Sequence, residues 1–194
     1  MKFWINTALL LATGLAFLPT ATPCTAQDST DDWRSLKAES KRLKIDDMSN
    51  LVRDKVLAND PKAQDLYDSA YGWAAFDNLK VAFGISGGAG NGVAVNKDSG
   101  ERTYMKMGTG GIGLGIGGQS YQVLYFFQDR QTYERFINEG WTADASAQAA
   151  AGTEGANART GFVNGVAVWQ MTEKGLMASA DVSGTKYWIN KKLN

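Results

Sequence analysis

Few residues in this chain of 194 amino acids have side chains that carry out bond-making chemistry. There is no histidine, which removes the most common general base and a frequent metal ligand. The one cysteine, Cys24, can form neither an internal disulfide nor a cysteine-based zinc site. Ser86, Ser120 and Ser179 therefore have no histidine that could activate them as nucleophiles. We expect a protein that is not an enzyme, with no metal site and no cofactor.

A glycine pattern resembling a nucleotide-binding motif, G-x-G-x-x-G, occurs at Gly113, Gly115 and Gly118. A nucleotide fold needs this motif between a strand and a helix. Here the glycines alternate with branched apolar residues, and a second apolar run, residues 121–127, follows. The pattern predicts a strand that leads into a buried strand, with one bare face that another element can approach closely. We expect an N-terminal helix or the opposite wall of a small barrel to pack there.

Carboxylates offer little more. The pairs Asp31–Asp32 and Asp46–Asp47 stand at the starts of predicted helices, where aspartate is a preferred cap. Asp181 lies on the polar face of a predicted strand near the C-terminus. Hydrolysis by a pair of acids, however, needs a second carboxylate at a fixed separation. The carboxylates therefore predict caps and not a catalytic pair.

The basic residues are numerous but balanced, because 20 Lys and Arg face 20 Asp and Glu. This balance argues against nucleic acid as a partner, which needs a basic excess. The basic residues do concentrate on one predicted amphipathic helix, residues 33–45, whose apolar stripe is Trp33, Leu36, Ser40 and Leu43. Such a helix can lie on an anionic membrane. We favour the alternative, in which the stripe packs on the domain and the basic face is solvated.

Lysine and tryptophan together are typical of edges that contact a membrane. Outside this helix, Lys80, Lys106, Lys174 and Lys186 lie at predicted strand ends or on polar strand faces. The candidate lipid-binding residues are Trp33, Arg34, Lys37, Lys41, Arg42 and Lys44 on the helix, with Lys80, Lys106, Lys186 and Trp188 from the strands.

The first 26 residues have the layout of a secretory signal peptide, with Lys2, an apolar run and small residues up to Ala26. The apolar run is short for an uncleaved membrane anchor. Pro23 just before Cys24 fits poorly with lipidation of that cysteine. We expect cleavage after Ala26 and a periplasmic or secreted protein.

The elements that must position these residues are predicted from periodicity. Helices are expected at 33–45, at 46–58 and from Pro61 to about Tyr71, with Asp60 as the cap of the third. About eight short strands in hairpin order follow, with turns at 87–91 and 98–100. A further helix is capped by Asp129 and extends over 129–139. The expected fold is α+β, with N-terminal helices packed on a curled, Gly-rich, mainly antiparallel, barrel-like sheet.

One stretch, Leu66–Val95 (LYDSAYGWAAFDNLKVAFGISGGAGNGVAV), resembles the opening of the SYLF lipid-binding domain. The resemblance continues through GTGGIGLGIGGQSYQVLYFFQD and ends with EKGLMASADVSGTKYW, so that it covers roughly residues 50–190. It gives a division into a signal peptide (1–26), a polar leader with the basic helix (27–45) and a SYLF-like domain (46–194).

The resemblance implies a non-enzymatic domain that binds membrane lipid. Eukaryotic relatives bind phosphoinositides and some fungal relatives bind actin, but an exported chain does not meet cytosolic actin. The expected function is a lipid- or membrane-binding module of the bacterial cell envelope, with phospholipid as the partner. The alternative is a structural envelope protein that acts through protein–protein contacts, using a sheet edge or the 142–160 loop.

Overall fold

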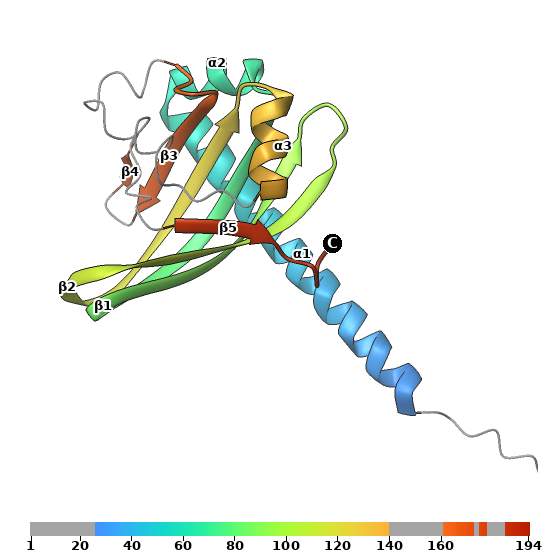
Figure 1. Cartoon of the computed structure of the whole chain (residues 1–194). Helices are drawn as coiled ribbons and strands as arrows, with labels where there is room; N and C mark the ends of the chain where they lie inside the picture. The colour runs from blue at the N-terminus through green and yellow to red at the C-terminus, as the bar shows by residue number, and fades with distance from the viewer. Residues whose placement is uncertain (1–25, 140–160, 173–174, 178–184) are drawn as a thin grey trace, which may run out of the picture.

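The computed structural model describes residues 26–139, 161–172, 175–177 and 185–194. The predicted signal peptide with Cys24, the 142–160 loop and Asp181 lie outside the described residues. The order of elements is α1 (Ala26–Asn59), α2 (Pro61–Ser69), β1 (Gly72–Asn96), β2 (Arg102–Phe127), α3 (Arg130–Glu139), β3 (Val166–Thr172), β4 (Gly175–Met177) and β5 (Thr185–Ile189). Figure 1 shows helices packed around one curled antiparallel sheet, which confirms the predicted α+β class.

The first helix, α1, is continuous, and the prediction of two helices that meet at Asp46 is wrong. The Asp46 carboxylate caps no helix start and instead bonds to Arg102 and Tyr104 on β2. The predicted division between residues 45 and 46 therefore falls inside α1. The buried residues Ile45, Ser49, Val52 and Val56 are spaced by three and four, which places them on one face of the helix.

Packing of the Trp33 stripe on the domain is also contradicted. Trp33 is 66% exposed, Leu36 52% and Leu43 58%. Because α1 does not break at Asp46, its N-terminal half keeps the same face turned inward as its C-terminal half. At 100° per residue, the stripe then lies about half a turn away from the packed face.

The two shorter helices begin as their capping residues predict. The Asp60 carboxylate accepts a hydrogen bond from the Lys62 amide at 3.1 Å, and Pro61 occupies the first turn of α2. The Asp129 carboxylate accepts from the Thr132 amide at 2.8 Å, at the start of α3. These caps satisfy amides that have no partner within the helix.

Two long strands, β1 with 25 residues and β2 with 26, replace the many short strands that the sequence predicted before residue 127. They pair from Gly72↔Phe127 to Val95↔Arg102. The ribbon is closed by the predicted turn at 98–100, where Gly100 has φ +71°. The predicted turn at 87–91 is wrong, because these residues lie inside β1 and remain paired with β2. The two paired strands bend together instead, with a register shift between Phe83 and Ile85.

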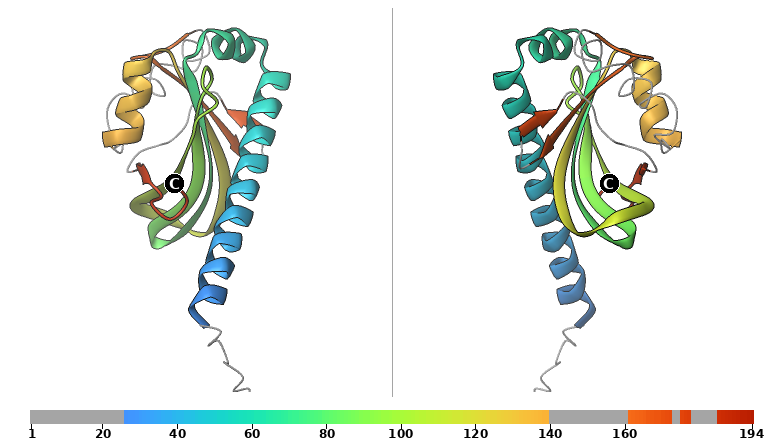
Figure 2. Two further views of the ribbon diagram at one scale, coloured as in Figure 1. Left: turned by 90° about the vertical axis from the view of Figure 1, so that its right-hand side faces the viewer. Right: turned by 90° about the vertical axis from the view of Figure 1, so that its left-hand side faces the viewer.

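Close approach of backbone is required at glycines within β1. A Cβ on Gly92 would lie 2.2 Å from the Ala75 carbonyl oxygen, and one on Gly90 would lie 2.4 Å from that of Asp77. The two halves of β1 therefore come together after the bend, and Figure 2 shows how strongly the long strands β1 and β2 curl. The sequence also predicted close packing at Gly113, Gly115 and Gly117. The structure does not describe what surrounds these three glycines, so this stays a prediction.

The sheet has the order β1-β2-β3-β4, with β5 also paired to β2. No pairing between described strands joins its two ends, so it is curled and not a closed barrel. Helices α1 and α2 cover one face, and α3 lies with β5 over the other (Figure 2). Two apolar cores result, one centred on Trp73, Phe126 and Trp169 under α1 and α2, the other on Phe76, Tyr125, Phe136 and Tyr187.

Candidate functional site

A basic groove lies between the N-terminal half of α1, strand β2 and the segment that follows β5, with a volume of about 660 Å³. Five of its lining residues carry a positive charge, and no Asp or Glu is among those in the described part of the chain. The lining residues are Arg34, Lys37, Ala38, Lys41, Lys106, Asn190, Lys192 and Leu193. We call this feature the basic groove. It offers hydrogen-bond donors in excess and a local positive potential.

One wall of the basic groove is an edge of α1. Arg34, Lys37 and Lys41 follow one another at intervals of three and four, so they project from the same side of the helix. Arg42 holds this part of α1 in place, because its Nε donates to the Leu193 carbonyl at 2.7 Å. Its guanidinium also lies 5.9 Å from the centre of the Tyr104 ring.

A second connection fixes α1 on β2 one turn further along. The Asp46 carboxylate accepts from Arg102 at 2.9 Å and from the Tyr104 hydroxyl at 3.0 Å. Burial, and then the hydrogen bond to Asp46, raise the pKa of Tyr104. The phenol therefore remains a protonated donor at neutral pH.

On the other side, Lys106 of β2 lines the groove, and the outward face of β5 adjoins it. Lys106 and Trp188 are direct cross-strand partners, while their neighbours Met105, Met107 and Tyr187 are buried. Alternation therefore turns Lys106 and Trp188 outward together with Lys186. Trp188 is 41% exposed, and its ring covers Gly108, where a Cβ would lie 3.0 Å away.

The last residues of the chain complete the groove. The backbone N–H of Asn190 and the side-chain Nδ2 of Asn194 both donate to the Tyr104 carbonyl, at 2.9 and 2.8 Å. These bonds hold the segment after β5 against β2 and bring Lys192 into the groove. Sequence reasoning missed Lys192, although a pair of lysines directly after an amphipathic strand was a visible signal.

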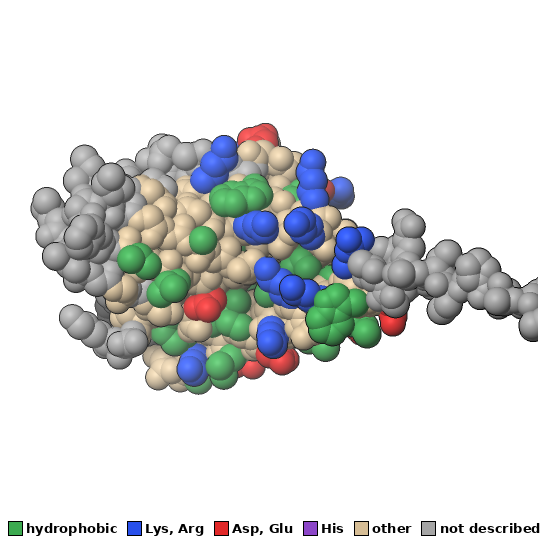
Figure 3. Space-filling view, turned by 90° about the horizontal axis from the view of Figure 1, so that it is seen from below, with side chains coloured by type: hydrophobic (Ala, Val, Ile, Leu, Met, Phe, Trp, Pro, Cys, Tyr) green, Lys and Arg blue, Asp and Glu red, His purple; other side chains and the backbone are tan. Residues whose placement is uncertain are grey.

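The structure brings together only some of the predicted residues. Arg34, Lys37, Lys41 and Lys106 line the basic groove, and Lys186 and Trp188 adjoin it on β5. Arg42 is half-buried and serves α1 packing. Trp33 and Lys44 are exposed on α1 outside the lining. Lys80 pairs with Gln119 near the bend of the ribbon and does not line the groove. Figure 3 shows Lys and Arg side chains gathered on the underside between exposed hydrophobic ones.

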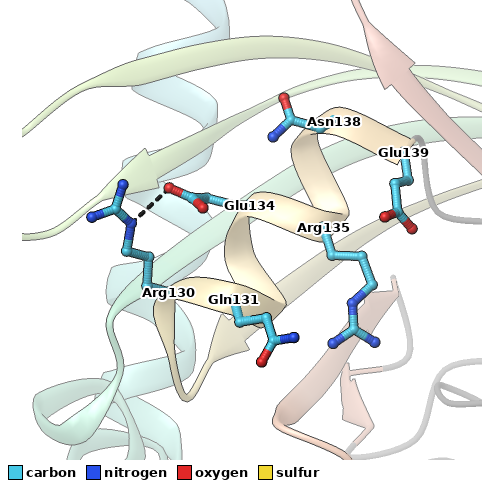
Figure 4. Close-up of a pocket in the computed structure, with 6 residues that line it drawn as sticks. All are labelled: Arg130, Gln131, Glu134, Arg135, Asn138 and Glu139. Carbon is cyan, nitrogen blue, oxygen red and sulfur yellow. Dashed lines mark hydrogen bonds and ion pairs between the residues drawn. The ribbon is translucent and has the colours of Figure 1, made fainter.

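A second hollow lies on the outward side of α3 (Figure 4). All six residues that line it belong to this one helix, and both signs of charge occur among them. Arg130 and Glu134 form an ion pair at 2.7 Å, which raises the pKa of Arg130. The hollow is a space between solvated side chains of a single helix and presents no converging set of groups.

Two further types of site are absent from the described residues. No group of three or more Cys, Asp or Glu side chains is placed to hold a metal ion. No helix in the described ranges combines the length and apolar character needed to cross a bilayer.

Comparison with known proteins gives two matches. Residues 108–194 match the Ysc84 family, described as Las17-binding protein actin regulator. The chain is also 38% identical over 156 residues to a protein of Aeromonas veronii named Beta cell expansion factor A. That alignment covers 80% of this chain and 60% of the relative, so the chain spans less than two thirds of the relative's length.

Proposed function

This chain carries a domain of the Ysc84 family, which is the SYLF family, and from that premise we propose that it is a non-enzymatic module that binds anionic phospholipid membranes. The observation that carries the proposal is the basic groove, where five cations from α1, β2 and the C-terminal segment converge. Like charges brought together repel one another, and an anionic surface relieves that repulsion. Phospholipid is the proposed partner, in place of nucleic acid or actin.

The chemistry of the groove suits phosphate oxygens. Lysine and arginine present only donors, and hydrogen bonds between charged partners are the strong ones. Lys37, Lys41, Lys106 and Lys192 make no ion pair with any described residue, so their charge is available to a ligand. The groove contains donors but no nucleophile paired with a base, which fits binding better than catalysis.

The rim supplies an anchor of the kind found at membrane interfaces. Trp188 combines a large apolar ring with an indole N–H, and such side chains favour the boundary between headgroups and acyl chains. It stands beside Lys186 and opposite Lys106, so one surface offers cations to headgroups and a ring to the interface. In this proposal the protein acts in the bacterial envelope or outside the cell, after export by its N-terminal segment.

Vesicle co-sedimentation tests the proposal. The protein should bind vesicles that contain anionic phosphatidylglycerol, bind neutral phosphatidylcholine vesicles less, and release from the anionic vesicles as salt rises. Lys41→Gln combined with Lys106→Gln removes two groove cations. At about 1 kcal/mol for each lysine near an anionic surface, the affinity should fall roughly 30-fold.

A matched control changes the net charge equally elsewhere. Lys55 and Lys62 are exposed and do not line the groove. The double variant Lys55→Gln with Lys62→Gln should bind almost as tightly as the unchanged protein. Equal losses in both double variants would show that net charge and not the groove determines binding. Failure to bind any vesicle at low salt would eliminate the proposal and favour a structural protein with protein partners.

A further inference from the structure

The outward face of α1 is a second feature that the basic groove does not explain. Trp33, Leu36 and Leu43 are more than half exposed on a helix whose opposite face is already packed. Large apolar side chains that gather on one exposed face indicate an interaction surface. We call the face formed by Trp33, Leu36, Ser40 and Leu43 the outer seam.

The outer seam has the spacing of a coiled coil. Its residues follow one another at intervals of three, four and three, which corresponds to positions a, d, a and d of a heptad. The two leucines occupy d, and Trp33 and Ser40 occupy a. The next a position is Asp47, where two carboxylates would face each other, so the repeat ends there after about two heptads.

The charges beside the outer seam are arranged asymmetrically. The g positions on one flank hold Asp32 and Glu39, and the e positions on the other flank hold Lys37 and Lys44. In a parallel pair of helices, position g of one chain meets position e of the next heptad in its partner. Asp32 would then face Lys37 of the second copy, and Glu39 would face Lys44 of the second copy.

This asymmetry selects among the occupants that an apolar helix face can have. A helix that lies on an anionic membrane has basic residues along its polar face, whereas here an acidic flank would be brought against the headgroups. An antiparallel pair would place g against g and e against e, so acids would meet acids and lysines would meet lysines. Only the parallel pairing with an identical helix gives opposite charges on both sides.

The fold leaves room for a second helix. The outer seam lies about half a turn from the packed face of α1, so a partner helix approaches from the side away from the sheet. The N-terminal turns of α1 also extend beyond the sheet, as Figures 1 and 2 show. Two copies can therefore meet along α1 with their sheets on the outside.

We propose that the outer seam of α1 binds the same seam of a second copy of this chain, in parallel and in register, to form a homodimer. This goes beyond the membrane binding proposed above and uses the adjacent face of the helix, with Lys37 at the boundary between the basic groove and the outer seam. A seam of about two heptads is short, so the dimer is weak and depends on protein concentration. Binding to a membrane raises the local concentration and favours it.

Sedimentation equilibrium with a charge-swap cycle tests the pairing. The average mass of the protein should rise with concentration toward twice that of the monomer. Glu39→Lys and Lys44→Glu should each weaken the dimer roughly tenfold, because two attractive pairs become repulsive. The double variant should restore it. The two residues are five apart and lie on different sides of one helix, so only contacts between chains can produce the rescue.

A cysteine variant tests the register independently. Ser40→Cys, in a Cys24→Ser background, places one thiol at an a position, where in-register parallel helices approach within disulfide range. A disulfide dimer should form in air, whereas cysteine at the exposed position Lys55 should form none. A monomer at all concentrations overturns the proposal. A dimer that the double swap does not restore, or that Ser40→Cys does not cross-link, overturns the parallel pairing. Vesicle binding is a separate measurement and can succeed or fail independently.

Discussion

At the scale of single residues, the fold depends most visibly on glycines that admit another part of the backbone. Gly90 and Gly92 are two residues apart in β1, so they lie on the same face of the strand, and both face carbonyl oxygens of its first half. A rigid carbonyl cannot move aside as the end of a flexible side chain can. The curl of the ribbon is therefore possible only while these positions carry no Cβ.

Gly92→Ala should lower the free energy of unfolding by about 3 kcal/mol, because its Cβ would lie 2.2 Å from the Ala75 oxygen. Gly87→Ala is the control in the same strand, since nothing lies within 4 Å of the added Cβ. That variant should be neutral or slightly stabilising. Urea denaturation of both variants measures the difference. Equal effects would show that the two halves of β1 do not approach as closely as described.

Some residues of the basic groove could be predicted from the sequence, and others could not. Lys37, Lys41 and Lys106 could be named from charge and periodicity alone. Arg42 belongs to the same basic run, but its bond to Leu193 spans 151 positions. Local patterning does not distinguish a solvated arginine from one that holds the tail. Lys192 was missed for the same reason, because its place depends on Asn190 and Asn194 bonding to Tyr104.

At the scale of elements, prediction succeeded where a local signal decides and failed where two signals conflict. Asp60 and Asp129 cap helices through amides two and three residues away. Asp46 has the same capacity but bonds to Arg102, 56 positions away, and the helix continues past it. The long ribbon was divided in the prediction because GGAGN has turn chemistry, whereas in the structure Gly88 and Gly90 of this stretch serve close packing.

Helix α1 has two opposite apolar faces, and only one of them stabilises the fold. Val52→Ala should lower the free energy of unfolding by about 2 kcal/mol, because Val52 is fully buried and its removal leaves a cavity. Leu51→Ala, next to it but 52% exposed, should change stability by less than about 0.5 kcal/mol. Thermal and urea unfolding of dilute protein check both. A large loss for Leu51→Ala would place the packed face of α1 elsewhere.

At the scale of the whole molecule, the two proposals assign different surfaces to different partners. The basic groove and β5 are assigned to the membrane, while the outer seam on the other side of the α1 basic edge is assigned to a second copy. Each surface has one exposed tryptophan, Trp188 on β5 and Trp33 on the seam. Trp73 and Trp169 lie in the core with at most 2% exposure. In the part of the chain that the structure describes, each proposed contact therefore has one tryptophan that can serve as an optical reporter.

Fluorescence quenching by vesicles with brominated acyl chains can determine which surface meets the bilayer. Bromine quenches only those indoles that reach the interface, so the unchanged protein should lose part of its emission on binding. Trp188→Phe should abolish most of that quenching, whereas Trp33→Phe should retain it, because Trp33 faces the second copy and not the lipid. Trp33 is 66% exposed and Trp188 41%, and phenylalanine keeps an aromatic ring at each position, so neither variant should unfold the protein. If quenching disappears with Trp33→Phe and persists with Trp188→Phe, the membrane occupies the outer seam, and the assignment of the two surfaces is wrong.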